Sequence, residues 1–220
     1  MNIFCASAAI SLAILAATGA HASMGPEGRL APRNECVGVS GLAQLDAGLR
    51  EAARDRDTDA LLALVDENIV LDFGGGSGKS ELAQRLTSPE YKLWEELDAA
   101  LELGCGYSTA ENGSRNAAWP WYFNKNLGQG DPFETYAVTG TGVRLRKGSS
   151  ISSPVIGSVS WDYVTIMDYP STDATYASVR TRWGQTGYMA AKYLRSEVDY
   201  RLVANETDGK WRVTAFVAGD

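Results

Sequence analysis

The chain has 220 residues, of which 27 are acidic and 20 basic, and its net charge at neutral pH is −7. This length suffices for one large domain or two small ones. Because nucleic acids and nucleotides are bound largely through Lys and Arg, the acidic balance predicts no nucleic-acid partner and no nucleotide.

Residues 1–22 are predicted to be a signal peptide. They contain an uncharged run of Ala, Ile, Leu, Ser and Thr that ends in Ala20, His21 and Ala22, and small residues at Ala20 and Ala22 suit signal peptidase. The alternatives are a short membrane anchor or a buried helix, but the run is too short and Ala-rich to favour a span. We therefore expect a periplasmic or secreted protein with no stable membrane span after cleavage.

Cleavage before Ser23 would also remove His21, the only histidine. The remaining chain then offers no Ser-His-Asp triad, no Cys-His pair and no histidine metal site. The sequence accordingly predicts no metal, no cofactor and no identifiable catalytic residue.

Residues 36–107 are predicted to form a helical or α+β unit. Val39, Leu42, Leu45 and Leu49 recur at helical spacing. A second short helix is expected over residues 60–65, a strand over 69–73, a third short helix over 79–86, and a fourth helix from 88 to 103.

Cys36 precedes the first of these helices and Cys105 follows the last. In an oxidising compartment an even pair of cysteines indicates a disulfide, which here would tie the two ends of the unit together. Two unpaired buried thiols are the alternative.

Two short motifs in this unit imitate ligand loops. Residues 73–80 (Phe-Gly-Gly-Gly-Ser-Gly-Lys-Ser) resemble a phosphate-binding loop, but the leading glycine is replaced by Phe73. Asp55, Asp57, Asp59 and Asp66 have the spacing of positions one, three, five and twelve of a calcium loop, yet Ala60 stands where the sharp turn needs glycine. We interpret the second motif as a solvated turn between helices and expect no nucleotide at the first.

Residues 108–134 are expected to connect this unit to the C-terminal part of the chain. The segment is rich in Gly and Asn, and its density of aromatic residues indicates that it docks on another part of the protein. The aromatic residues are Trp119, Trp121, Tyr122, Phe123 and Phe133.

Residues 135–196 carry three motifs in a fixed order. They are residues 142–146 (Gly-Val-Arg-Leu-Arg), 153–157 (Ser-Pro-Val-Ile-Gly) and 184–189 (Gly-Gln-Thr-Gly-Tyr-Met), the last followed by Tyr193 and Leu194. This order resembles bacterial Src-homology-3-like (SH3-like) domains, which are small β-barrels. The resemblance implies a barrel that binds peptidoglycan or a peptide.

Five aromatic residues of this segment are candidates for lining a ligand groove, since aromatic rings stack on sugars and peptides. Each could instead belong to the core or shell of a small barrel. For Trp183, at a predicted hairpin tip, the alternatives are contact with a ligand, packing against the N-terminal unit, and exposure without a contact. The five candidates are Trp161, Tyr163, Tyr176, Trp183 and Tyr188.

Residues 198–220 are predicted to form a C-terminal hairpin around Asp208 and Gly209. It could return to pair with the strand at 69–73. Helices, one strand and a final hairpin weakly resemble a nuclear-transport-factor-2-like (NTF2-like) α+β domain, which implies a cavity near Asp72 and a barrel inserted into the domain.

The sequence thus predicts an α+β protein in which the N-terminal unit is joined to an SH3-like barrel. The leading hypothesis is an exported, non-catalytic protein of the cell envelope whose barrel binds a peptidoglycan or peptide component. One alternative is a small-ligand binder or enzyme with a cavity near Asp72. The other is a protein–protein interaction module whose partner surface includes Trp183 and residues 119–123.

Overall fold

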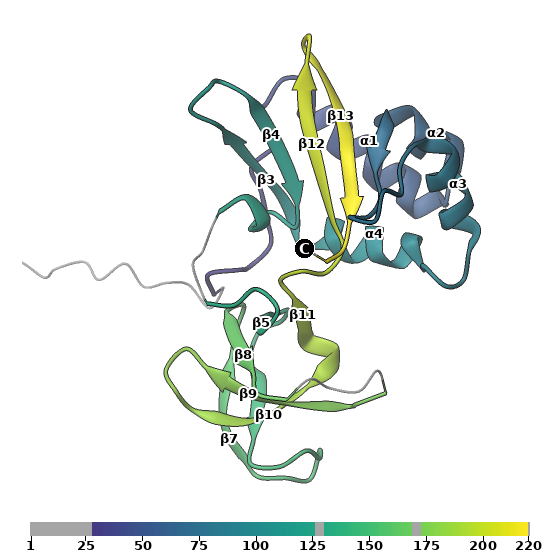
Figure 1. The fold of residues 1–220 in the computed structure, drawn as a ribbon. Coiled ribbons are helices and arrows are strands. Elements are labelled where there is room, and N and C mark those ends of the chain that lie inside the picture. Colours follow the sequence, from purple (N-terminus) through teal and green to yellow (C-terminus); the bar gives the residue numbers. More distant parts are fainter. Residues whose placement is uncertain (1–27, 126–129, 169–172, 220) are drawn as a thin grey trace, which may run out of the picture.

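The computed structural model describes residues 28–125, 130–168 and 173–219, and the predicted signal peptide lies outside them. The described residues form helices and two β-sheets, which confirms the predicted α+β class (Figure 1). No helix within these ranges is long and apolar enough to cross a membrane.

Four α-helices pack against the six-stranded sheet, and their apolar side chains form its main core (Figure 1). Leu42, Leu45 and Leu49 share one face of the first helix and are at most 4% exposed. The second helix begins where the Asp57 carboxylate accepts the Ala60 N–H over 3.0 Å. The helices are α1 (Leu42–Asp55), α2 (Thr58–Leu64), α3 (Lys79–Thr87) and α4 (Leu93–Glu102).

The fourth helix is shorter than its sequence predicts. It begins at Leu93 rather than near Ser88, because Lys92 adopts a left-handed backbone conformation with φ 50°. The N–H of Ser88 instead closes the end of α3 by donating to the Arg85 carbonyl over 3.2 Å.

The six-stranded sheet has the order β1-β3-β4-β12-β13-β2. Strand β1 is parallel to β3, β2 is parallel to β13, and the other pairs are antiparallel. Its strands are β1 (Arg33–Asn34), β2 (Val65–Val70), β3 (Gly104–Thr109), β4 (Arg115–Trp119), β12 (Arg201–Thr207) and β13 (Lys210–Val217).

The C-terminal hairpin β12–β13 returns to the N-terminal unit, as predicted. Leu202 of β12 pairs with Trp119 of β4, and Ala215 of β13 pairs with Val70 of β2. The hairpin therefore fills the middle of the sheet rather than extending the second sheet.

The segment expected to be a connecting loop, residues 108–134, contributes a strand instead. Strands β3 and β4 form a hairpin whose second strand lies within that segment. Strand β3 is not evident in the sequence because it contains Gly104 and Gly106, and glycine disfavours strands. Both positions need glycine because another backbone lies against them. A Cβ on Gly104 would meet the Arg33 carbonyl oxygen at 1.9 Å, and a Cβ on Gly106 would meet the Trp121 carbonyl oxygen at 2.0 Å.

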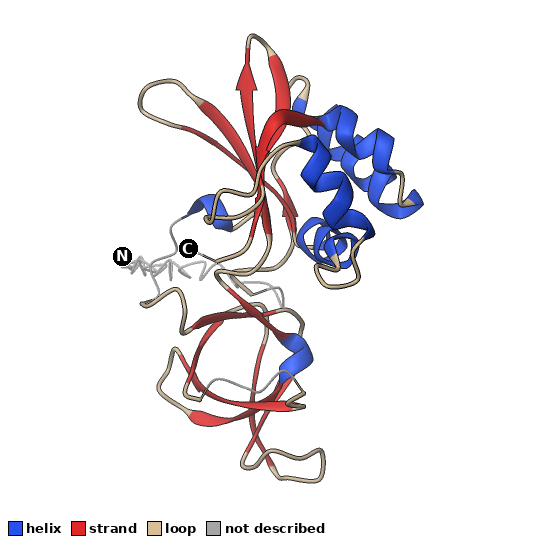
Figure 2. Cartoon of the chain, turned by 45° about the vertical axis from the view of Figure 1, so that its right-hand side comes forward, coloured by secondary structure: helices blue, strands red, loops and turns tan. Residues whose placement is uncertain are grey.

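The second sheet, which we call the curled sheet, bends round its own core (Figure 2). Its order is β11-β5-β8-β9-β10-β6-β7, and every neighbouring pair is antiparallel. Its strands are β5 (Thr135–Val138), β6 (Val143–Arg146), β7 (Val155–Val159), β8 (Tyr163–Ile166), β9 (Tyr176–Thr181), β10 (Thr186–Ala190) and β11 (Leu194–Ser196). Short 3-10 helices occupy Phe123–Lys125 (η1) and Ala191–Tyr193 (η2).

A third apolar cluster joins the two sheets, and we call it the junction core. Trp121 and Tyr122 follow β4 and pack beside Tyr163 of β8, with the Tyr122 ring edge-on to both neighbours at centroid distances of 6.2 and 6.3 Å. The aromatic segment is thus docked, as its composition predicts. The Leu30 N–H also donates to the Trp161 carbonyl over 2.8 Å across this junction.

The disulfide between Cys36 and Cys105 is present, which confirms the predicted pair. The two Cα atoms lie 5.9 Å apart, and both side chains are fully buried in the main core. The bridge joins the segment before α1 to β3.

Candidate binding groove

A groove with a volume of about 640 Å³ opens on the curled sheet. Its walls come from the turn at 140–142, from β6 and from Ile151 in the loop between β6 and β7. The opposite wall is made by residues 174–176 and by the end of β10 with η2. The groove therefore lies between loops that are far apart in the sequence and that the sheet brings together.

The apolar surface of the groove is aromatic and aliphatic. Tyr176 stands at the start of β9 and Tyr193 in η2, and both are partly buried. The Ile151 side chain is 75% exposed at the rim. An exposed aliphatic residue beside partly open rings is typical of a ligand site lined by hydrophobic groups with a few polar ones.

The charged residues among the described lining of the groove are basic. Arg144, Arg146 and Lys192 line it, and the described wall residues include no Asp or Glu. The Lys192 ammonium lies 4.9 Å from the centre of the Tyr193 ring. In a chain with a net charge of −7, three cations around one groove form a local positive field.

Arg144 and Arg146 both line the groove, as expected for residues two apart on a strand, whose side chains point to the same side. The register of β6 with β7 shifts between Leu145 and Arg146, where Ile156 of β7 has no partner on β6. Arg144 is exposed, whereas Arg146 is only 5% exposed and its Nη1 donates to the Ser153 carbonyl over 2.8 Å.

The structure does not gather the five aromatic candidates at one place. Tyr176 lines the groove, but Tyr163 is buried in the junction core and Trp161 packs against it, with its indole N–H donating to Thr141 over 3.0 Å. Tyr188 is half-buried on β10, where it pairs with Arg146. Of the five, only Tyr176 is carried into the candidate site.

Trp183 lies in the turn between β9 and β10, at the opposite end of β9 from Tyr176. Its side chain is 65% exposed, so it does not pack against the N-terminal unit. The Arg182 guanidinium stacks 4.7 Å from the Trp183 ring and is held by Asp162 through a 2.9 Å ion pair. Trp183 is thus an exposed but oriented ring outside the groove.

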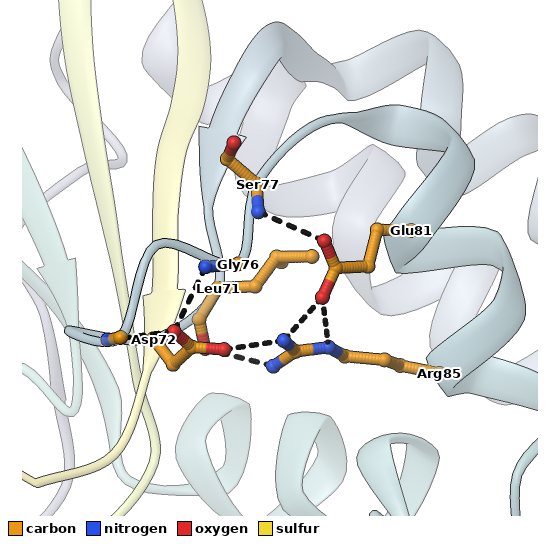
Figure 3. A network of polar contacts seen from close by, with 7 residues as sticks. Leu71, Asp72, Gly76, Ser77, Glu81 and Arg85 are labelled. Atoms are coloured by element: carbon orange, nitrogen blue, oxygen red, sulfur yellow. Dashed lines mark hydrogen bonds and ion pairs between the residues drawn. The ribbon is translucent and has the colours of Figure 1, made fainter.

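Asp72 is the anchor of the glycine loop after β2 (Figure 3). One of its carboxylate oxygens accepts the N–H groups of Gly74 and Gly76 over 2.8 and 2.9 Å, and the other is paired with Arg85 of α3. The hydrogen bond from Arg85, followed by that from Gly76, lowers the pKa of Asp72. An engaged carboxylate with a lowered pKa is a poor general base, because such a base needs a pKa near the working pH.

The same network occupies backbone N–H groups of the segment that resembles a phosphate-binding loop. Glu81 of α3 accepts the Ser77 N–H over 3.1 Å and is also paired with Arg85 (Figure 3). The N–H groups of Gly74, Gly76 and Ser77, which an anion would need, are therefore bonded to the protein's own carboxylates.

The aspartates with calcium-loop spacing serve the helices around them. Asp57 caps α2, Asp55 is paired with Arg54 over 2.8 Å, and Asp66 accepts the Asn68 N–H over 2.9 Å. Within the described ranges, no group of three or more His, Cys, Asp or Glu side chains is arranged to hold a metal ion.

No protein-family model and no curated protein matches this chain. Among solved structures, the chain is similar to an NTF2-like design with five substitutions: the identity is 12%, 80% of this chain and 95% of the design are covered, and the TM-score is 0.30. It is also similar to a protein of unknown function with a cystatin-like fold from Nostoc punctiforme, at 12% identity, 81% and 86% coverage and a TM-score of 0.26. At these TM-scores neither similarity assigns a family or a function.

Proposed function

We propose that this chain is an exported, non-catalytic binding protein of the cell envelope, and that its curled sheet is an SH3-like barrel whose groove holds a peptidoglycan or peptide segment. The observation that carries the proposal is the 640 Å³ groove, which combines apolar walls with basic side chains. A concave, mostly apolar surface with a few polar groups is the usual form of a site for a small molecule or a short chain segment.

The framework of the groove supports binding without a large rearrangement. Gly187 of β10 lets β6 cross closely, since a Cβ there would meet the Arg146 carbonyl oxygen at 2.6 Å. The wall residues Val143 and Tyr193 belong to or pack against the core of the curled sheet. A wall that is fixed before binding loses little conformational freedom when a ligand arrives.

Export is supported by the disulfide and by the predicted signal peptide. A buried disulfide between Cys36 and Cys105 is typical of proteins that fold in an oxidising compartment. A periplasmic or secreted location would place the groove within reach of the cell wall.

The test is retention of the purified protein on isolated peptidoglycan sacculi. We expect wild-type protein to be retained well above an unrelated acidic protein of similar size. Replacing Ile151 with Asp and Tyr176 with Ala should lower retention at least about fivefold, because each removes apolar contact from the groove wall. Trp183→Ala is the matched control, since it removes a larger exposed ring away from the groove.

Two outcomes would contradict the proposal. One is no retention of the wild-type protein above the acidic control. The other is retention that Ile151→Asp and Tyr176→Ala leave unchanged while Trp183→Ala removes it, which would favour a surface at the β9–β10 turn instead.

A further inference from the structure

Arg146 carries a buried positive charge that the protein does not neutralise. Its side chain is 5% exposed, and its Nη1 donates a 2.8 Å hydrogen bond to the uncharged Ser153 carbonyl. None of the ion pairs between described residues includes Arg146. A buried charge is costly unless it is paired, so an unpaired guanidinium on a groove wall points to a partner from outside.

Two other buried arginines have carboxylate partners. Arg85 is paired with both Asp72 and Glu81, and Arg195 is paired with Asp199 over 3.4 Å. Arg146 differs from both, because it lies on a groove whose described wall residues include no acid.

The other two guanidinium nitrogens of Arg146 are not completely buried. Within the described residues, the Tyr122 hydroxyl is the one fully buried side-chain N or O atom without a hydrogen-bond partner. The Nε and Nη2 atoms of Arg146 are thus not sealed in the interior, and Arg146 is one of the residues that line the groove. They form one side of the planar fork with which arginine binds a carboxylate through two parallel hydrogen bonds.

We propose that the groove selects its ligand by a carboxylate that Arg146 binds, with Arg144 and Lys192 adding attraction at the rim. This inference rests on the proposed function and names the chemical group that the groove recognises, which is a free carboxylate of a peptidoglycan stem peptide. A single buried guanidinium in a groove that tyrosine and isoleucine side chains also line suits one planar carboxylate on a peptide. A polyanionic phosphate polymer suits it less, because the net charge of −7 repels a chain of like charges outside the groove.

The experiment compares two preparations of sacculi, both stripped of phosphate polymers. One keeps its stem-peptide carboxylates and the other has them converted to amides. We expect wild-type protein to bind the carboxylate form about tenfold more tightly or better, since a hydrogen-bonded charge pair discriminates strongly against its uncharged analogue.

Variants separate Arg146 from general electrostatics. Arg146→Gln should bring the two preparations within about twofold of each other, and Arg146→Lys should restore only part of the preference because it lacks the planar fork. Arg212→Gln on β13 removes the same formal charge from an exposed position on the other sheet and should leave the preference intact. The melting temperature of each variant shows whether it is folded, and the wild-type comparison needs no variant at all.

Each outcome has a distinct meaning. Equal binding of wild type to both preparations would overturn the carboxylate inference and leave the proposed function standing. Retention on neither would overturn both. A preference that persists in Arg146→Gln but is lost in Arg212→Gln would assign the effect to overall charge, and binding restored only when phosphate polymers are left on the sacculi would replace the carboxylate with a phosphate.

Discussion

The indole N–H of Trp119 donates to the Asp46 carboxylate over 2.8 Å in the middle of the main core. Asp46 lies on α1 and is 6% exposed, and Trp119 ends β4 and is fully buried. The other carboxylate oxygen accepts from the Asn34 amide over 2.9 Å and from Arg50 over 3.1 Å. One buried acid thus links a helix, the segment at β1 and the strand from which the chain leaves for the curled sheet.

Asp46→Ala should destabilise the protein by roughly 2–4 kcal/mol, because it leaves three donors without their acceptor, one of them buried. Urea unfolding followed by tryptophan fluorescence measures this. Asp59→Ala, on the exposed side of α2, is the matched control and should change the free energy of unfolding by less than about 0.5 kcal/mol. A loss below about 1 kcal/mol at Asp46 would mean that the link contributes little.

Replacing both Cys36 and Cys105 with Ala should lower stability by about 4 kcal/mol in the chain-entropy model, since the bridge closes a loop between residues 69 positions apart. The expected loss is seen as a lower urea midpoint, and reduction of the wild-type protein with dithiothreitol should reproduce it. If reduced and oxidised protein unfold at the same urea concentration, the bridge does not act through the unfolded chain.

Tyr122→Phe should leave stability unchanged or raise it by about 1 kcal/mol. The Tyr122 hydroxyl is fully buried without a hydrogen-bond partner in the described residues, and burial raises its pKa far above the usual value. Tyr122→Leu is the control: it removes the ring that packs between Trp121 and Tyr163 and should destabilise the junction. A loss of more than about 1 kcal/mol in Tyr122→Phe would show that the hydroxyl has a partner.

Glu197→Gln should stabilise the protein at pH 7. Burial raises the pKa of Glu197 in the folded state, so the folded chain holds this proton more tightly than the unfolded chain does. The free energy of unfolding therefore falls as pH rises from about 4.5 through the raised pKa of Glu197. At pH 7 the full cost of burying the ionised carboxylate is present. The advantage of Glu197→Gln should vanish below about pH 4; urea unfolding at several pH values measures it, with the exposed Glu111→Gln as the control variant.

Trp183→Ala should change the melting temperature by no more than about 2 °C, because the ring is exposed and stacks only on Arg182 among its described contacts. Differential scanning fluorimetry measures this. If the melting temperature is unchanged but capture of an envelope protein is lost, the alternative of a protein–protein surface at this turn gains support.

Much of the architecture could be predicted because its signals are local. The helical spacing of Leu42, Leu45 and Leu49 places α1, and the Asp208-Gly209 turn places the β12–β13 hairpin. The pairing of Cys36 with Cys105 follows from an even cysteine count after export. The sequence does not indicate strand β3, because Gly104 and Gly106 lower its strand propensity. Glycine is needed at both positions because the backbones of Arg33 and Trp121 lie against them, and no local pattern shows these contacts.

Of the residues predicted to contact a ligand, only Tyr176 lies on the groove wall that the structure describes. The aromatic pattern also indicates Tyr163, which the junction core buries, and it gives no signal for Arg146, because an arginine is exposed by default. The burial of Arg146 depends on how β6 pairs with β7 and β10, so the order of residues carries no signal for it. The SH3-like and NTF2-like resemblances remain predictions for the same reason: they concern how strands close, not which residues form them.

The order of strands also sets the order in which this protein can be completed as it emerges from N to C terminus. Both bridged cysteines and all four described α-helices precede the curled sheet, while β12 and β13, which separate β4 from β2, come last. Until they arrive, β4 and β2 each expose an open edge, and open edges invite pairing between chains. The vulnerable interval of biosynthesis therefore runs from the appearance of Cys105 to that of Val217, and a chain cut short in this interval can close its disulfide yet still aggregate through unfinished strands.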